Sequence, residues 1–139
     1  MADTVFSKIL SGEIPSHKIY EDELVYAFLD VGPLSEGHTL LIPKEPAVTM
    51  DQLSERSAEA LGRVMPRLCR AVKKATGCDQ YNLLQNNGAL AHQAVMHLHF
   101  HIIPKPNERE GLGVGWPSKN IDHEVGAALA QKIAAALDD

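Results

Sequence analysis

The first third of the chain predicts one short helix followed by three strands. Apolar residues within 5–10 repeat with helical spacing, and Gly12 ends the pattern. Two apolar runs at 17–20 and 24–30 have strand character, and the three acidic residues between them are typical of a hairpin turn. A third run at 38–43 is apolar enough to form a central strand.

The middle of the chain predicts the main helix and two more strands. From Ser54 onward, apolar residues recur at positions i, i+3, i+4, i+7 and i+11, and this pattern ends near Gly77. Pro66 lies inside the segment, so a kink or an unpaired carbonyl group is expected there. Strand patterns follow at 81–85 and 95–103, which brings the predicted sheet to five strands.

The last part of the chain predicts a long loop and a second main helix. Residues 104–120 contain three Gly and three Pro without apolar periodicity, which predicts a functional loop or a segment that contacts a partner. Asp122 is expected to cap a helix with Val125, Leu129 and Ile133 on one face. We therefore predict a single α+β domain over residues 1–139, with the helices on one side of a mostly antiparallel sheet.

Composition and charge narrow the class of protein. The formal net charge is −5, and no run of Lys and Arg offers the basic face that a nucleic-acid backbone requires. Nucleic acid is therefore not expected as a partner. The aliphatic runs are too short to cross a bilayer and no signal-peptide pattern is present, so a membrane is not expected as a partner either. Cys69 and Cys78 are too few for a disulfide framework. The expected compartment is the cytoplasm, with the nucleus as an additional one.

Three histidines alternate with apolar residues in the strand predicted at 95–103. Side chains alternate between the two faces of a strand, so His97, His99 and His101 are expected to share one face. Each neutral imidazole brings a donor and an acceptor that need partners. Three such rings on a half-buried face would be costly unless they are bonded or functional.

Three interpretations of this cluster are open. The histidines can form a solvated or incidental group. They can bind a metal, because two imidazoles on one strand can hold a zinc ion. They can also be catalytic, with one neutral imidazole offering Nε2 to an electrophile while a carbonyl holds its Nδ1–H. The surrounding residues favour the catalytic interpretation.

Residues 93–103 are similar to the signature of the histidine-triad (HIT) family, His-x-His-x-His-x-x with x apolar. The similarity covers about residues 5–106, and residues 107–139 diverge most. The matching blocks resemble the Hint branch of nucleoside phosphoramidases rather than the Fhit branch of dinucleoside polyphosphate hydrolases. Further blocks in the family's order and spacing lie at 6–9, 12–15, 27–30, 37–44 and 86–88.

The resemblance implies a role for each histidine. His99 matches the nucleophile that attacks the α-phosphorus and becomes adenylylated, and His97 matches the position whose carbonyl accepts the His99 Nδ1–H. His101 matches the residue that hydrogen-bonds the phosphate or leaving group, and His38 matches a further histidine beside the phosphate. Gln93 matches the residue that contacts the bridging atom and the phosphate.

The resemblance also implies a purine nucleotide site. Asp30 matches the carboxylate that accepts both ribose hydroxyls, and Asn86 matches a position near the phosphate and ribose. The alternative for Asp30 is a turn or cap at a strand end, and the alternative for the apolar positions is plain core. The residues that match the walls around the purine are Val5, Phe6, Ile9, Phe28 and Val31.

The chain departs from the family pattern next to the triad. His92 stands where many members have Gly, and Ala94 stands where a Ser often touches the leaving group. The leaving-group proton is therefore left to His101, Gln93 or water.

The implied function is a hydrolase that releases AMP from adenosine 5′-phosphoramidates or acyl- and aminoacyl-adenylates through a covalent AMP–histidine intermediate. Two alternatives stay open: a dinucleoside polyphosphate hydrolase, and an AMP-binding sensor or scaffold with incidental turnover. Some relatives bind structural zinc through a Cys-x-x-Cys pair, but Thr4 and Ser7 occupy the matching positions. Neither a metal nor another cofactor is therefore expected. The family also implies a homodimer.

Overall fold

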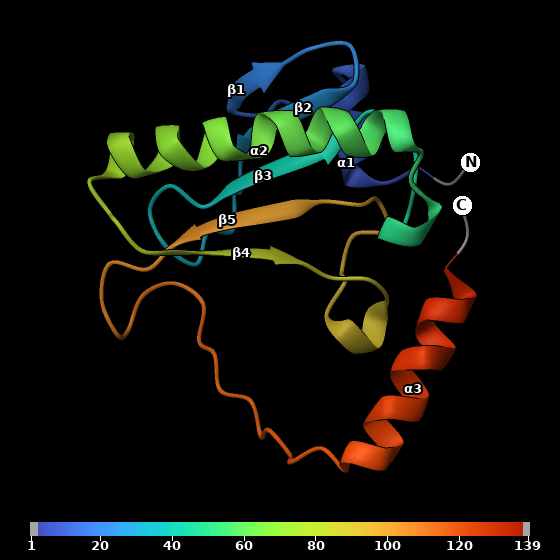
Figure 1. The fold of residues 1–139 in the computed structure, drawn as a ribbon. Coiled ribbons are helices and arrows are strands. Elements are labelled where there is room, and N and C mark those ends of the chain that lie inside the picture. Colours follow the sequence, from blue (N-terminus) through green and yellow to red (C-terminus); the bar gives the residue numbers. More distant parts are fainter. Residues whose placement is uncertain (1–2, 138–139) are drawn as a thin grey trace.

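A five-stranded antiparallel sheet in the order β1-β2-β3-β5-β4 forms the centre of the computed structural model, which describes residues 3–137 (Figure 1). The strands are β1 Lys18–Glu21, β2 Val25–Leu29, β3 Thr39–Pro43, β4 Tyr81–Gln85 and β5 Phe100–Pro104. The helices are α1 Val5–Ser11, α2 Glu55–Thr76 and α3 His123–Ala136, with short 3₁₀ turns at Met50–Gln52 and Ala89–Ala91. The predicted number of strands is confirmed.

Helices cover both faces of the sheet, so the expectation that they lie on one side was wrong. Along β2, Val25 and Ala27 face the core beneath α2, whereas Tyr26 and Phe28 face the cluster beneath α1. Side chains alternate along a strand, so a strand that is apolar at successive positions must be covered on both faces. Phe6 of α1 packs against the Phe28 ring with 5.5 Å between centroids and supplies this second cover.

The main helix α2 has the predicted ends. Ser54 caps its N-terminus by accepting the Ser57 N–H, and Gly77 ends it in the left-handed conformation with φ 71°. The helix continues through Pro66, because the ring lies on the exposed side and Gly62, whose carbonyl loses its partner, is also exposed. No helix within residues 3–137 has the length and apolar content needed to cross a membrane.

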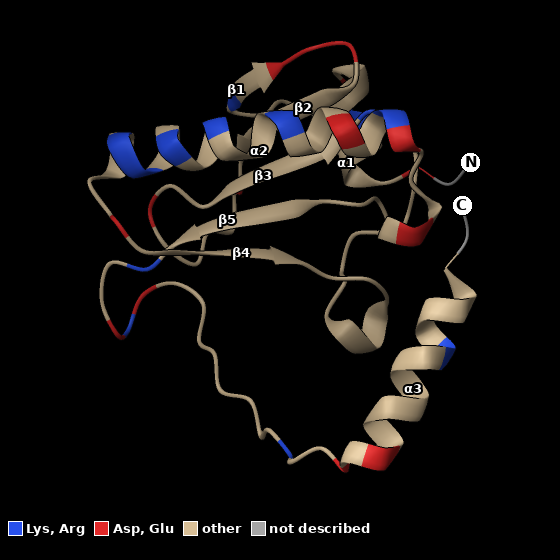
Figure 2. Ribbon diagram, in the orientation of Figure 1, with Lys and Arg blue, Asp and Glu red and all other residues tan. Residues whose placement is uncertain are grey.

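One exposed face of α2 is basic, although its cations are spaced along the helix and do not form a run in the sequence. Arg63, Arg67, Arg70 and Lys74 are spaced by four, three and four residues, so they share one side of the helix. Figure 2 shows Lys and Arg positions along the length of α2. The salt bridges found within residues 3–137 involve other side chains.

The second main helix forms where it was predicted but packs on nothing within the described residues. Asp122 caps α3 by accepting the backbone N–H groups of the first turn. The helix has no buried residue, and its apolar stripe of Val125, Leu129 and Ile133 is more than half exposed. Figure 1 shows α3 standing away from the sheet at the end of an extended segment.

Candidate active site

The histidine-rich segment is only partly a strand, so the strand predicted from residue 95 was wrong in its first half. β5 begins at Phe100, and His97 and His99 lie in the irregular segment before it. Pro43, at the end of the neighbouring β3, has no N–H to donate to a longer ladder. Its carbonyl oxygen instead accepts a hydrogen bond from His97 Nε2 at 2.8 Å.

The alternation of faces expected for the triad nevertheless persists through this segment. Leu98 is fully buried in the core beneath α2. His97 and His99 lie beside the Phe6 ring of α1, at centroid distances of 6.3 and 4.9 Å. The His99 and His101 rings are 4.9 Å apart, so the triad forms one continuous group on the α1 side of the sheet.

His99 presents an unprotonated nitrogen to the space in front of it. Its Nδ1 lies 2.7 Å from the His97 carbonyl oxygen, which can only accept, so Nδ1 carries the proton. The opposite nitrogen, Nε2, therefore holds a free lone pair. Burial lowers the pKa of His99, whose side chain is only 7 % exposed, so the ring is neutral at physiological pH.

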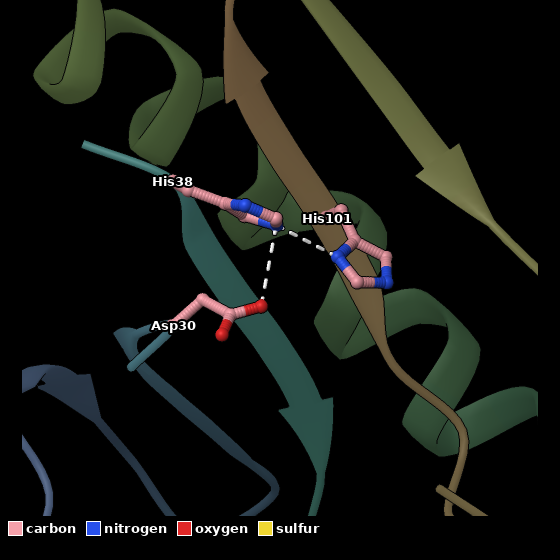
Figure 3. A group of neighbouring side chains, drawn as sticks. All are labelled: Asp30, His38 and His101. Atoms are coloured by element: carbon pink, nitrogen blue, oxygen red, sulfur yellow. Dashed lines mark hydrogen bonds and ion pairs between the residues drawn. The ribbon is translucent and has the colours of Figure 1, made fainter. Parts of the chain in front are cut away.

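His101 presents the opposite group, a proton, because of a chain of hydrogen bonds behind it. The Leu34 N–H donates to His38 Nδ1 at 3.1 Å, so the His38 proton is on Nε2. That Nε2–H donates to His101 Nδ1 at 2.8 Å (Figure 3). His101 then carries its own proton on Nε2. Burial, with the nearby His99 and His38, lowers the pKa of His101 to about 4 and keeps it neutral.

A cavity of about 350 Å³ opens in front of His99 and His101. It is lined by every apolar residue that was expected around the purine. These residues come from α1 and from the end of β2: Val5, Phe6, Ile9, Phe28 and Val31. Its lining also includes Asp30, Ala94 and three residues of the turn after α1, Ile14, Pro15 and Ser16, to which the sequence analysis gave no role. The Gly12 to Pro15 block was noticed only as family resemblance, and nothing in its pattern indicated that it lines the cavity.

Asp30 combines the two roles considered for it. Its Oδ1 accepts the Gly32 N–H at 2.8 Å, which is the turn interaction. Its Oδ2 lies 3.5 Å from His38 Nε2 (Figure 3). The carboxylate is therefore fixed in position and keeps acceptor capacity for a ligand.

Gln93 and Asn86 are not among the residues that line the cavity. The Gln93 side chain is 3 % exposed, donates to the Val48 and Val95 carbonyls and accepts the Gly88 N–H. Both amide N–H donors are bonded to backbone carbonyls, and the expected contact of Gln93 with the bridging atom and the phosphate stays a prediction. Asn86 makes one long hydrogen bond, 3.5 Å, to the His92 carbonyl, and its role near the phosphate stays a prediction.

The backbone conformation of His92 explains why many family members have Gly at the matching position. It is the one residue other than glycine within residues 3–137 with a positive φ, 70°, and it ends the short 3₁₀ turn before Gln93. Glycine adopts this conformation without strain, which accounts for its frequency at the matching position.

Asp30, His38 and His101 resemble a metal site, since one ligand atom of each lies within 4.8 Å of the others (Figure 3). A metal on His38 Nε2 would require the proton on Nδ1. That nitrogen faces the Leu34 N–H, another donor, whereas metal-bound histidines donate their second N–H to an acceptor. The surroundings therefore suit a proton between the two rings and do not suit a cation.

The chain is similar to proteins that have been named and to structures that have been solved. The family described as HIT domain matches residues 11–108. The adenosine 5′-monophosphoramidase hnt1 of Schizosaccharomyces pombe is 51% identical over 133 residues, covering 96% of this chain and 97% of that protein. HNT1 of Saccharomyces cerevisiae, with the same activity in its name, is 43% identical and covers 99% and 84%. The crystal structure of a HIT family member from Bacillus subtilis matches with a TM-score of 0.94 at 35% identity, over 99% of each chain. The chain therefore belongs to the HIT family of histidine-triad proteins.

Proposed function

We propose that this protein is a nucleotide hydrolase that releases AMP from adenosine 5′-phosphoramidates, and from acyl- or aminoacyl-adenylates, through a covalent AMP–His99 intermediate. The observation that carries the proposal is the 2.7 Å hydrogen bond from His99 Nδ1 to the His97 carbonyl, which directs the Nε2 lone pair away from the backbone. The phosphoramidase names of relatives at 51% and 43% identity support the substrate class.

In the first step, the Nε2 lone pair of His99 attacks the α-phosphorus. A bond forms between phosphorus and Nε2, the bond to the leaving nitrogen breaks, and that nitrogen keeps the electron pair and takes a proton from solvent. The His101 Nε2–H donates to a phosphoryl oxygen as negative charge develops there. Ala94 lines the cavity beside the triad and has no group that could supply the proton.

In the second step, water attacks the same phosphorus from the side of the departed amine. The phosphorus–Nε2 bond breaks, its electron pair returns to Nε2, and one proton of the water passes to solvent. The intermediate carries positive charge on the His99 ring, whose Nδ1–H donates to the partly negative His97 carbonyl oxygen. The same contact therefore activates the nucleophile and stabilises the intermediate.

The size of the cavity favours a mononucleoside over the alternative dinucleoside substrate. Ligand sites span about 300–1,000 Å³, and this cavity of about 350 Å³ is at the small end. Its apolar lining residues, which include Phe6 and Phe28, surround room for one base. A second nucleoside would have to lie outside it.

The direct test is to trap the intermediate. Wild-type protein is mixed with adenosine 5′-phosphoramidate, quenched without acid and digested for mass spectrometry, with His99→Ala beside it and the exposed His17→Ala as control. We expect AMP on His99 alone, and a loss of turnover of at least about a thousandfold in His99→Ala. His99→Ala should still bind AMP, because the ribose and purine contacts come from other elements.

Three results would contradict this mechanism. AMP attached to His97 or His38 would move the nucleophile, and near-normal turnover in His99→Ala would remove it. Tight AMP binding without any covalent intermediate in the wild type would favour the sensor or scaffold alternative.

A homodimer is also proposed. β4 is an edge strand, and its alternate apolar residues Tyr81 and Leu83 are 38% and 49% exposed. An open apolar edge of this kind pairs readily with another chain. Light scattering on Leu83→Glu should show a monomer where the wild type is a dimer.

The cytoplasm is the proposed compartment, with the nucleus as an additional one. Cys69 and Cys78 are both free thiols, which agrees with a reducing environment. Imaging of the tagged full chain in its own cells tests this.

A further inference from the structure

One polar residue of the cavity has no role in the proposed reaction. Ser16, Asp30, His99 and His101 are the polar residues among those that line it. The two histidines serve the phosphate and Asp30 serves the ribose. Ser16, in the turn between α1 and β1, is the polar residue without a role in that reaction.

Ser16 lies at the end of the cavity away from His99 and His101. Across the sheet the order runs from β5, which follows His99, through β3 and β2 to β1. The His17 carbonyl accepts the Leu29 N–H at 3.1 Å, so Ser16 lies on the β1 side of β2. Three strand spacings separate β1 from β5, about 14 Å. A nucleotide with its phosphate at the triad therefore extends its base toward Ser16.

The Ser16 hydroxyl is held in place by Tyr26. The two hydroxyl oxygens are 2.7 Å apart, and Tyr26 is 9% exposed with its ring 5.6 Å from that of Phe28. The Tyr26 hydroxyl has no other partner within residues 3–137, and a buried O–H must donate somewhere. Donation from Tyr26 to Ser16 Oγ satisfies that hydroxyl, so we take Tyr26 as the donor and Ser16 Oγ as the acceptor. The Ser16 O–H remains without an acceptor in residues 3–137.

The cavity wall around Ser16 is otherwise apolar, with Ile14, Pro15 and Phe28 beside it. A base enclosed there loses water from its ring nitrogens, which costs free energy unless a donor replaces that water. Among the residues that line this part of the cavity, Ser16 has the one side chain that can donate a hydrogen bond.

We propose that Ser16, oriented by Tyr26, recognises the base by donating a hydrogen bond to a purine ring nitrogen. N3 and N7 are acceptors in both adenine and guanine, so this contact selects a purine without choosing between the two. The inference rests on the proposed function, since it assumes a nucleotide whose phosphate lies at the triad.

The test is a cycle that removes either the hydroxyl or the acceptor. Dissociation constants are measured by calorimetry for AMP, GMP, 3-deaza-AMP, 7-deaza-AMP and ribose 5-phosphate. The proteins are the wild type, Ser16→Ala, Ser16→Thr and the exposed Ser11→Ala as matched control. We expect Ser16→Ala to weaken AMP and GMP binding by about two- to tenfold. Ser16→Thr, which keeps a hydroxyl, should restore most of the affinity.

The analogues identify the contact. One of the two deaza nucleotides should bind the wild type as weakly as Ser16→Ala binds AMP, and should be insensitive to Ser16→Ala. Affinity for ribose 5-phosphate, which has no base, should not change. Tyr26→Phe keeps the Ser16 hydroxyl but loses its orientation, so the loss should be smaller than in Ser16→Ala.

The proposal is overturned if Ser16→Ala weakens AMP, both deaza analogues and ribose 5-phosphate by one common factor, or behaves like Ser11→Ala. Failure of the proposed function has a different signature, which is the absence of AMP on His99 in the quench experiment. Thermal unfolding of each variant confirms that the protein measured is folded.

Discussion

The first and last helices of the chain were predicted by the same kind of pattern but have different surroundings. α1 has 7 residues, buries Phe6 beneath the sheet and lines the cavity with Val5 and Ile9. α3 has 14 residues and a side-chain cap, yet none of its residues is buried. Spacing and caps therefore predict that a helix forms, whereas the surface that covers its apolar side must be found elsewhere in the molecule.

The largest expected difference between the two helices is in stability. Phe6→Ala removes a buried ring that contacts Phe28 and His99, so the free energy of unfolding should fall by about 3–5 kcal/mol. Leu129→Ala on α3, where the side chain is 52% exposed, should cost less than about 0.5 kcal/mol in dilute protein. Urea denaturation followed by circular dichroism measures both.

Equal losses would mean that α3 is as well covered as α1. If the loss for Leu129→Ala instead rises with protein concentration, the cover for α3 is a second copy of the chain.

Asp30 should be needed for tight binding of the ribose of AMP in the cavity beneath α1. A hydrogen bond to a charged acceptor contributes about 1.5–3 kcal/mol, so Asp30→Ala should weaken AMP binding by the corresponding factor. Binding of 2′,3′-dideoxy-AMP, which has no ribose hydroxyls, should change little. Calorimetry with the exposed Asp51→Ala as control separates this from a general effect of charge. Equal losses for both nucleotides would remove Asp30 from the ribose site.

Much of the fold was predictable because local signals agreed with the packing. The ends of α2 followed from Ser54 and Gly77, and β4 has the predicted bounds. The start of β5 was not predictable, because it depends on the Pro43 carbonyl, 54 residues before His97, taking the imidazole bond. The missing cover of α3 likewise depends on surfaces distant in sequence.

Some features of the candidate site could likewise be predicted from the sequence and others could not. The proposed nucleophile and the apolar walls follow from the motif and its neighbouring blocks, and the structure brings those walls together around the cavity. The tautomer of His101 depends on the Leu34 N–H, and the burial of Gln93 depends on the Val48 carbonyl. Such contacts between distant segments leave no trace in spacing or composition.

The folded protein should lose stability in acid because of the buried histidines on the α1 side of the sheet. Burial lowers the pKa of His97, His99 and His101 below the unfolded value of about 6.5. The folded protein then binds fewer protons than the unfolded chain, so their contribution to stability is fully present above pH 6.5. As the pH falls below that value, the free energy of unfolding should fall by up to about 1.4 kcal/mol per pH unit for each histidine.

Urea denaturation between pH 7 and 5 measures this slope, above the range in which carboxylates titrate. Phe6→Ala uncovers the His97 and His99 rings and should make the slope shallower, whereas Leu129→Ala should leave it unchanged. A slope that is the same in all three proteins would show that α1 does not control the titration of the triad.

The smallest effect on stability is expected in the segment that leads to α3. Trp116 is 81% exposed there, and large exposed aromatic side chains in such segments often contact a partner or ligand. Trp116→Ala should change the free energy of unfolding by less than about 0.5 kcal/mol, because little buried contact is lost.

If this segment reaches the leaving-group side of a neighbouring subunit, the substitution should alter the ratio of kcat/KM between bulky and small amine leaving groups. AMP affinity should stay as in the wild type, since the residues that line the nucleotide cavity precede this segment. Steady-state kinetics with adenosine 5′-phosphoramidate and its lysine-like counterpart measure the ratio. A loss of AMP affinity with an unchanged ratio would instead place Trp116 against the nucleotide, and the C-terminal segment would then belong to the same functional unit as α1.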